Sequence, residues 1–452
     1  MDQMTDGNLL QLQDVLSCVI DQPAQGRFQV ARRMFADPAI FELEMRHIFE
    51  ASWVYLAHES QLPQPHDYFA TQIGRQPVLL LRGEDGALRC VYNSCSHRGA
   101  QLTSRKRGNQ KTLMCPYHGW VYDSSGRCVA VDNEERGAYP PAFTGESHDL
   151  VQVARLESYR GFVFASLSAE VPPLREYLSG ATALIDALAD QSPDGLEVLK
   201  GGIHYTCDSN WKMQLENIDG YHFFPVHASY IGVVMERMKS GGGGDKVKAI
   251  DASQLASIPG GNYDLGNGHI VDWAIMPNGD DRPLAFQRER INDEFGQTQA
   301  QWMIDAIRNL AVYPNLLLMD QSSTTIRVVR PLSVDRTQME VYCVAPRGEP
   351  AAARERRVRQ FEDFLGPAGM ATPDDQRVME LCQLGFAASD LGMLQGHYRG
   401  TGRLVQGPDE QARRIGLDVV SSGPDIDDET FAHAQYREWA RLMARGLESA
   451  DG

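Results

Sequence analysis

The chain has 452 residues, of which 42% are hydrophobic and 23% are charged, enough for two or three domains with at least one sizeable core. Its formal net charge of −17 argues against binding to nucleic acid or to an anionic membrane, because such a surface repels phosphate groups. We see no run of about 18 apolar residues and no basic leader before an apolar block, so we expect neither a transmembrane helix nor a signal peptide, and we place the protein in the cytoplasm.

The first third of the chain changes from a helical to a β-rich pattern. Residues 1–50 carry apolar side chains at helical spacing, from Leu9 to Ile48. In residues 51–168 short β-rich runs such as Pro77–Arg82 are separated by turn signals such as Gly83–Gly86. This alternation predicts an all-β module of residues 51–168.

Residues 169–452 mix both kinds of element. We expect strands at 203–207, 316–319, 324–330 and 339–343, and helices at 174–178, 181–188, from 210 and at 351–365. The Gly-rich stretch 240–268 suits a mobile loop or lid. The sequence therefore predicts an α+β fold in which the all-β module is inserted in a domain built from residues 1–50 and 169–452.

The first unusual pattern is a pair of short Cys/His segments. Cys95-Ser-His97 is followed, after 17 residues, by Cys115-Pro-Tyr-His118, whereas the other six cysteines are scattered singly. Two thiolates and two imidazoles can hold a metal centre, and a structural zinc site is the main alternative. Each segment carries one Cys and one His, the order that gives one iron of a cluster both thiolates and the other both imidazoles, which favours an iron–sulfur cluster.

This spacing resembles the Rieske [2Fe–2S] motif, Cys-x-His-x15–17-Cys-x2-His. The resemblance implies that Cys95 and Cys115 bind the inner iron, that His97 and His118 bind the outer iron, and that residues 51–168 are a Rieske domain. Two neutral imidazoles in place of thiolates raise the reduction potential of such a cluster. Of the flanking residues, Gly99 and Gly119 would let backbone N–H groups approach the cluster, and Trp120 would cover it.

The second pattern is the histidine pair in Asp219-x2-His222-x4-His227. On a helix, Asp219 and His222 lie on one face, whereas His222 and His227 stand about 140° apart. Pro225 lies between the histidines, and an internal proline kinks a helix enough to bring His227 back towards His222. Two histidines and one carboxylate form a facial triad that binds iron, although a pair of ordinary histidines on an aromatic helix is the alternative.

The Asp-x2-His-x4-His pattern resembles the catalytic helix of Rieske non-haem iron ring-hydroxylating oxygenases, large (α) subunit. These enzymes have a catalytic domain of the helix-grip type with an antiparallel sheet, here residues 1–50 and 169–452. The resemblance implies that His222 and His227 bind a mononuclear Fe(II). It makes Asp219 the bridge that accepts a hydrogen bond from His222 and reaches His118 of a neighbouring subunit's cluster.

The resemblance also implies a third iron ligand far downstream. The segment 366–375 looks like the family's carboxylate segment, and we assign Asp375, with Asp374 as the alternative. An acidic residue also favours the first turn of a helix, which suits Asp374. Family members usually carry an Asn three or four residues before the bridging Asp; Asn217 stands only two before Asp219, so we assign it no role.

Segments 50–60, 190–198 and 308–321 look like the benzoate/toluate 1,2-dioxygenase branch, which includes anthranilate and 2-halobenzoate dioxygenases. That branch implies cis-dihydroxylation of an aryl carboxylate with O2. Electrons come from NADH through a flavin–ferredoxin reductase, and the oxygenase is a head-to-tail trimer, α3 or α3β3 with a small β subunit. A Rieske monooxygenase or demethylase, or an anthranilate- or halobenzoate-type dioxygenase, is the alternative; a pure ferredoxin would need no second iron site.

The substrate contacts are less constrained than the metal ligands. Arg327 and Arg330 are an odd number apart on an expected strand and therefore point to opposite faces. Arg327 resembles the position that binds a carboxylate in a related aryl-dicarboxylate oxygenase, and a structural salt bridge is its alternative. Phe223 and Val226 fall where a pocket would be shaped, although core packing would use the same residues. The sequence does not specify the ring substituent.

Overall fold

The structure is a computed structural model that describes residues 12–239 and 258–450. The chain divides into two compact units. One unit is the continuous segment Phe49–Leu174, and the other combines the segment before it, up to Ile48, with the segment from Arg175 onward. Among the helices of the described residues, none has the length and apolarity that a membrane span requires.

The Phe49–Leu174 unit is built from antiparallel strands. One sheet has the order β6-β5-β4-β7 and two smaller sheets have the orders β10-β9-β8 and β11-β12-β3. The bounds are β3 Val54–His58, β4 Asp67–Ile73, β5 Gln76–Arg82, β6 Leu88–Tyr92, β7 Arg107–Asn109, β8 Thr112–Met114, β9 Val121–Asp123, β10 Cys128–Ala130, β11 Arg155–Tyr159 and β12 Phe162–Ser166. The one-turn helix α3 (Pro141–Thr144) lies in the long connection after β10.

The larger unit is organised around a 10-stranded sheet. Its strands follow the order β13-β20-β19-β18-β17-β16-β15-β22-β21, and β14 also pairs with β20; every pairing is antiparallel. The bounds are β13 Leu196–Val198, β14 Ile203–Cys207, β15 Gly260–Asp264, β16 Ile270–Ile275, β17 Ala306–Val312, β18 Leu316–Asp320, β19 Thr324–Ser333, β20 Arg336–Pro346, β21 Val405–Gln406 and β22 Ser421–Gly423. All four strands predicted in this region are present.

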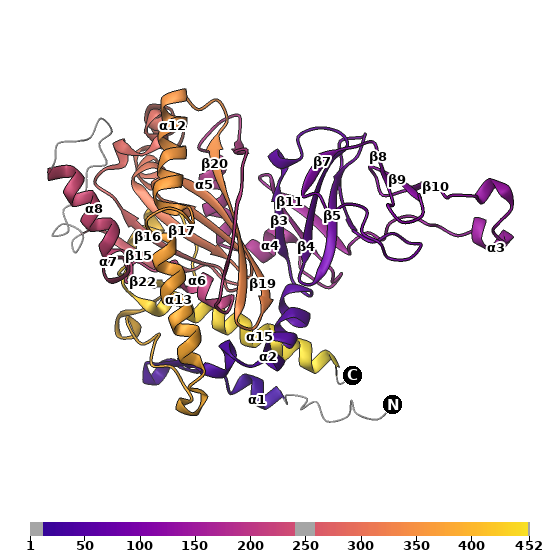
Figure 1. Ribbon diagram of the computed structural model, residues 1–452. Helices are drawn as coiled ribbons and strands as arrows, with labels where there is room; N and C mark the ends of the chain where they lie inside the picture. The colour runs from indigo at the N-terminus through magenta and orange to yellow at the C-terminus, as the bar shows by residue number, and fades with distance from the viewer. Residues whose placement is uncertain (1–11, 240–257, 451–452) are drawn as a thin grey trace. The chain divides into compact units, whose positions relative to one another are not determined.

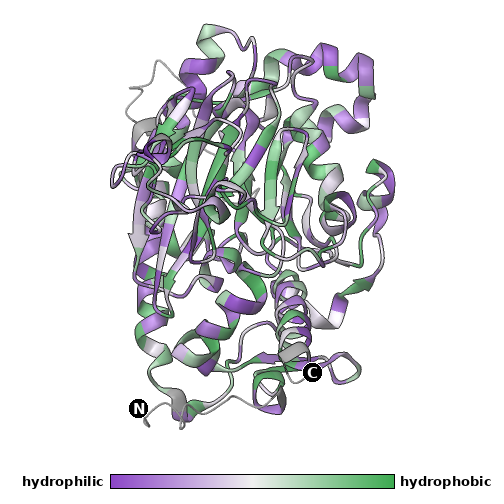
Figure 2. Ribbon diagram, turned by 90° about the vertical axis from the view of Figure 1, so that its right-hand side faces the viewer, coloured by the Kyte–Doolittle hydropathy of each residue, from purple (hydrophilic) through white to green (hydrophobic). Residues whose placement is uncertain are grey.

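Helices complete the larger unit, and α12 and α13 cross in front of the sheet in Figure 1. Their bounds are α4 Leu174–Leu178, α5 Ala181–Ala189, α6 Lys212–Glu216, α7 Phe223–Val226, α8 Ala228–Lys239, α10 Arg288–Phe295, α11 Gln297–Ala300, α12 Ala351–Gln360, α13 Thr372–Phe386, α14 Glu410–Ile415 and α15 Ala432–Ala450. Figure 2 shows hydrophobic stretches along the strands and alternating stretches on the helices. The α+β fold, with an all-β module and an antiparallel catalytic sheet, is confirmed.

The helical prediction for residues 1–50 is wrong in its middle. A β-hairpin of β1 (Val19–Gln22) and β2 (Arg27–Val30) separates α1 (Leu12–Leu16) from α2 (Pro38–Glu44). Gly26 helps to close the turn with a φ of 59°, a conformation that glycine adopts without strain. In so short a segment, the spacing of apolar residues fits the helical period as well as the strand period. Pairing between the two strands then determines which structure forms.

Two sequence predictions fall wholly or partly outside the described residues. Leu9 and Leu10 of the expected N-terminal helix precede residue 12. The expected Gly-rich lid, 240–268, lies outside them as far as residue 257, and its remainder contains β15 and the turn before β16.

A buried ion pair fixes α6, the helix before the histidine pair. Lys212 donates to Glu44 of α2 over 2.5 Å, and both side chains are almost completely buried. Trp211 and Trp439 each donate an indole N–H to the same Glu44 carboxylate, at 2.8 and 2.7 Å. A buried charge is stable only when it is paired and hydrogen-bonded, so this arrangement ties α6 to α2 and to α15.

Candidate active site

The two Cys/His segments form matching loops. In the first loop the N–H of Gly99 donates to the carbonyl of Cys95, and in the second the N–H of Gly119 donates to that of Cys115. Both glycines have positive φ, 74° and 73°, a conformation that side-chain-bearing residues rarely adopt. The glycines are therefore needed to turn the backbone back over each cysteine.

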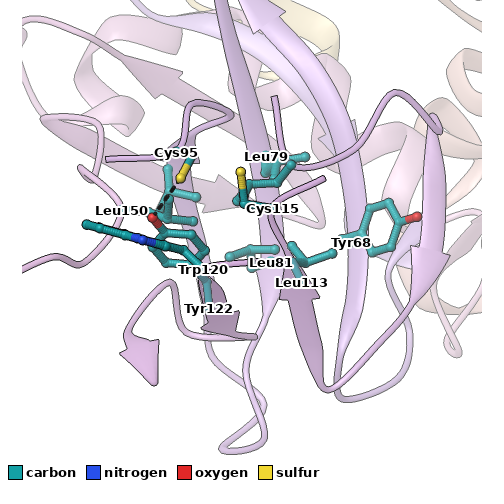
Figure 3. Close-up of a cluster of buried hydrophobic side chains, with 11 residues drawn as sticks. Tyr68, Leu79, Leu81, Cys95, Leu113, Cys115, Trp120, Tyr122 and Leu150 are labelled. Carbon is teal, nitrogen blue, oxygen red and sulfur yellow. Dashed lines mark hydrogen bonds between the residues drawn. The ribbon is translucent and has the colours of Figure 1, made fainter. Parts of the chain in front are cut away.

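The side chains of these loops gather at one buried cluster. Cys95 and Cys115 are 2% and 3% exposed, and Figure 3 shows both sulfur atoms at the same end of the cluster. The rings of His97 and His118 lie 4.5 Å apart, and Trp120 stacks on His97 at 4.9 Å and 7°. The structure thus brings together the four side chains predicted from the motif.

The chemistry of this donor set fits a [2Fe–2S] cluster. Nδ1 of His97 and Nδ1 of His118 are buried and have no hydrogen-bond partner among the described residues, which leaves both free to bind a metal. Desolvation and the neighbouring His118 and Arg98 lower the pKa of His97, so its imidazole is neutral, as metal ligation requires. The Sγ of Cys95 also lies 3.2 Å from the hydroxyl of Tyr122, and this hydrogen bond would affect the reduction potential of a bound cluster.

A second donor set converges in the larger unit. One ligand atom from each of His222, His227 and Asp375 lies within 4.8 Å of the others. Oδ1 of Asp375 is 3.2 Å from Nε2 of His227 and 3.5 Å from Nε2 of His222, and it makes no hydrogen bond of normal geometry. Ligands that share one divalent ion at about 2.1 Å stand about 3.0 to 3.4 Å apart, so the set fits a bound metal ion. Two histidines and one carboxylate suit Fe(II).

Asp219 orients one of these histidines. Its Oδ1 accepts hydrogen bonds from Nδ1 and from the backbone N–H of His222, both at 2.9 Å. In the neutral ring, a proton held on Nδ1 leaves the lone pair of Nε2 facing Asp375. A carboxylate behind a ligating histidine is the usual support of a metal site.

The two carboxylates also set the charge of the site. Burial lowers the pKa of His222, but the hydrogen bond to Asp219 and the attraction to Asp219 and Asp375 raise it to about 10. Without a metal the ring therefore carries a second proton, on Nε2, which a bound metal ion would displace. Burial raises the pKa of Asp375, whereas His222 and His227 lower it to about 2. The site therefore favours an added positive charge, as a divalent cation supplies.

The prediction of a helix through Asp219 and His222 is wrong. Helix α6 ends at Glu216, and after an irregular stretch the single turn α7 begins at Phe223. The carboxylate of Asp219 bonds the backbone N–H of His222 in place of a helical carbonyl, a competition typical of Asp. His227 then lies between α7 and α8, where its ring is 5.4 Å from that of His222.

The structure separates the two candidate acidic residues of α13. Asp375 is 7% exposed and faces the histidines, whereas Asp374 accepts a hydrogen bond from the Ser229 hydroxyl at 2.9 Å. Both residues follow Pro373 in the first turn of α13, where consecutive side chains point about 100° apart around the helix axis. Only one of the two therefore faces the histidines.

The candidates for substrate contact differ in burial and in the element that carries them. Phe223 is half-buried with its ring 5.6 Å from that of His227, and Val226 is half-buried on the same turn. Arg327 is 6% exposed on β19 and forms no ion pair with the described residues. Arg330, on the opposite face, pairs with Glu340 at 2.7 Å, so the salt-bridge alternative describes Arg330 and not Arg327.

Sequence reasoning missed several residues around the site. The Phe364 ring lies edge-on to that of His227 at 5.9 Å and tilted against that of Tyr230 at 4.8 Å. Asn309 donates to the carbonyl of Ile218 at 3.0 Å. Tyr205 of β14, which lies within electrostatic reach of Arg327 and Asp375, was missed as well.

Comparison with known proteins identifies both parts of the chain. The family model of the Rieske [2Fe-2S] domain matches residues 52–157, and that of the ring hydroxylating alpha subunit (catalytic domain) matches residues 196–445. The chain is 45% identical to the toluate 1,2-dioxygenase subunit alpha of Pseudomonas putida, covering 96% of this chain and 94% of the relative. It is 41% identical to the 2-halobenzoate 1,2-dioxygenase large subunit of Burkholderia cepacia, covering 96% and 93%.

Solved structures agree with the sequence comparison. Naphthalene 1,2-dioxygenase with indole bound in its active site is 25% identical to this chain, with a TM-score of 0.79 and 93% and 94% coverage of the two chains. Naphthalene 1,2-dioxygenase from Rhodococcus sp. shares the fold, with a TM-score of 0.80, 24% identity and 96% and 97% coverage.

Proposed function

The chain belongs to the family of Rieske ring-hydroxylating dioxygenase α subunits, and we propose that it cis-dihydroxylates a benzoate-type aryl carboxylate. Its cofactors are a [2Fe–2S] cluster and a mononuclear Fe(II). The relatives at 45%, 41% and 38% identity are named for toluate, 2-halobenzoate and anthranilate, all of them aryl carboxylates. The naphthalene relatives, named for a hydrocarbon, are 30% identical.

The observation that carries this proposal is the presence of both donor sets in one chain. We assign Cys95, Cys115, His97 and His118 to the cluster and His222, His227 and Asp375 to Fe(II). When bound, the cluster supplies single electrons and the ferrous ion supplies the position at which O2 reacts.

The remaining residues hold the substrate and the ligands. Asp219 keeps the proton of His222 on Nδ1, so the lone pair of Nε2 stays directed at the iron position. As part of the proposal, the same carboxylate reaches His118 of a neighbouring copy. Phe223 and Val226 form apolar walls that exclude water from the ring.

The proposal includes partners. Relatives are named as α or large subunits, or as the large oxygenase component of a system, which supports a separate electron-donating protein. We assign that role to an NADH-dependent flavin–ferredoxin reductase and propose a head-to-tail trimer of this chain, with a small β subunit. The trimer would let Asp219 of one copy meet the cluster of the next.

A substrate panel tests this function. Substituted benzoates, anthranilate, phthalate isomers and arenes without a carboxylate are supplied with the reductase and ¹⁸O2. We expect NADH oxidation coupled to a cis-diol carrying both labelled atoms, for aryl carboxylates in preference to neutral arenes. A product with one labelled oxygen would assign a monooxygenase or demethylase instead.

Arg327 is proposed as the anchor of the substrate carboxylate. Replacement of Arg327 with Leu is expected to raise KM for benzoate by about 10- to 100-fold, the weight of a charged hydrogen bond. Because Arg327 is a buried cation without an ion pair, its removal should not lower the melting temperature.

Arg330→Leu is the matched control on the same strand. It leaves the buried carboxylate of Glu340 without its arginine, so the melting temperature should fall while KM for benzoate changes little. An unchanged KM for benzoate in Arg327→Leu would remove Arg327 from the substrate site.

A further inference from the structure

The segment between the two cluster loops carries a concentration of positive charge. The whole chain has 43 basic and 60 acidic residues, yet it has no acidic residue between Asp85 and Asp123. Within that interval the segment 105–111, Arg-Lys-Arg-Gly-Asn-Gln-Lys, has four basic residues in seven positions. The local field there is therefore opposite in sign to that of the molecule as a whole.

Three of these cations project from the surface without a counter-ion. Arg105, Arg107 and Lys111 are exposed, and none of them forms an ion pair with a described residue. Together they form the basic strip. Lys106, within the same segment, lies over the Phe69 ring with its Nζ 4.9 Å from the ring centroid. The strip therefore presents three positive charges that the described part of the chain does not neutralise.

The strand β7 fixes the direction in which the strip points (Figure 1). It lies at the edge of its sheet and pairs with β4, with Arg107 opposite Phe69 and Gly108 opposite Tyr68. Gly108 lies against the Tyr68 side chain, because a Cβ added to this glycine would be 2.6 Å from the Tyr68 hydroxyl. Alternate residues of a strand point to opposite sides, so Arg107 points away from the core.

The carboxylate on the paired strand does not neutralise the strip. Asp67 of β4 lies opposite Asn109, whose side chain donates to its Oδ1 at 2.8 Å, and its Oδ2 accepts from the N–H of Gln64 at 2.7 Å. Charge also protects sheet edges against pairing with another chain, but β7 has only three residues, and so short an edge needs little protection. Neither pairing within the sheet nor edge protection accounts for the strip.

The strip lies close to the cluster ligands. Lys111 directly precedes β8 and stands four residues before Cys115. Four extended residues span at most about 14 Å, so the backbone of Lys111 lies within that distance of the backbone of Cys115. Electron transfer slows steeply with distance, so a protein that reduces the cluster has to bind on a surface of this kind.

We propose that the basic strip is the docking surface of the electron-donating protein, which binds it through an acidic face. The inference rests on the proposed function, in which that protein supplies electrons to the cluster. Segment 105–111 contains no hydrophobic residue, whereas permanent interfaces between subunits are apolar at their centre. A donor has to bind, deliver an electron and leave, and small interfaces steered by charge suit such transient contacts.

Charge reversal in the holoenzyme tests the docking surface. In Arg107→Glu we expect the second-order rate constant for reduction of the cluster by the NADH-reduced reductase, measured by stopped-flow absorbance, to fall about tenfold or more at about 0.01 M salt. The double variant Arg105→Glu/Arg107→Glu should be slower still. At about 1 M salt, where charges are screened within about 3 Å, the variants and the wild type should differ by less than about twofold.

Arg136→Glu is the matched control. Arg136 is exposed in the same unit, in the long connection after β10, and its reversal changes the total charge by the same amount. The rate constant for its reduction should change by less than about twofold, because it lies outside the strip. All variants are exposed substitutions and should keep the iron and sulfide content and the oligomer of the wild type.

A single turnover separates docking from chemistry. Protein reduced beforehand with dithionite, freed of the reductant and mixed with benzoate and O2 needs no donor, so Arg107→Glu should form as much diol per chain as the wild type. The docking surface is wrong if both Glu variants are reduced by the reductase as fast as the wild type at low salt. It is also wrong if they lose the wild-type oligomer, because the strip would then be a contact between copies. If the pre-reduced wild type forms no diol from any aryl carboxylate, the proposed function itself fails.

Discussion

Replacing Asp375 with Asn is expected to abolish product formation, by a factor of about 10³ or more. The amide keeps the shape of the side chain but loses the negative charge that the two facing imidazoles and a ferrous ion require. Iron content should fall from about three to about two atoms per chain, because the cluster in the other unit is untouched. Metal analysis, together with the visible spectrum of the cluster, checks both parts.

Asp374→Asn is the matched control, one residue away on the same turn of α13. Asp374 bonds Ser229, and its Oδ2 is 3.9 Å from Nδ1 of His227. This variant should keep the full iron content and most of the activity. The assignment of Asp375 would be wrong if Asp374→Asn lost one iron while Asp375→Asn retained it.

The second large effect is expected at Asp219. In Asp219→Asn the amide oxygen can still accept the proton of His222 Nδ1, so both metal sites should remain filled. The charge that would link His222 to the neighbouring copy is lost. We expect coupled turnover to fall by about 10- to 100-fold, the range typical of changes to a group that hydrogen-bonds a metal ligand. Product formed per NADH consumed is the readout.

Asp427→Asn separates a general loss of negative charge from the loss of this carboxylate. Asp219 and Asp427 lie within electrostatic reach, but Asp427 makes no hydrogen bond with His222 among the described residues. Turnover by that variant should stay close to normal. An Asp219→Asn oligomer that is intact, fully loaded and normally coupled would contradict the bridging role.

The cluster motif could be predicted from the sequence because its determinants are local. Each Cys/His segment is a short loop, and the positive φ of Gly99 and Gly119 is anticipated by the residue type itself. The cluster follows from these residues and the mononuclear iron from the histidine pair, and the family models confirm the family and both cofactors.

The second site could be predicted only in part. The sequence pointed to His222 and His227, but it predicted a continuous helix where the Asp219 carboxylate competes for the backbone. It could not choose between Asp374 and Asp375 on physical grounds, because the direction of each side chain depends on where α13 begins.

The surroundings of Arg327 are the part that the sequence could not supply. Alternation predicted that Arg327 and Arg330 face opposite sides, but not which side meets the iron site. Tyr205 comes near Arg327 only because β14 pairs with the β19–β20 hairpin, which lies far from β14 along the chain. Such long-range pairing leaves no local pattern, as the missed β1–β2 hairpin also shows at shorter range.

The most direct test of two iron centres in one polypeptide is the metal and sulfide content of the anaerobically purified chain. The account predicts about three irons and two acid-labile sulfides per chain, and a red-brown colour that dithionite bleaches. A colourless protein that holds only zinc would contradict it.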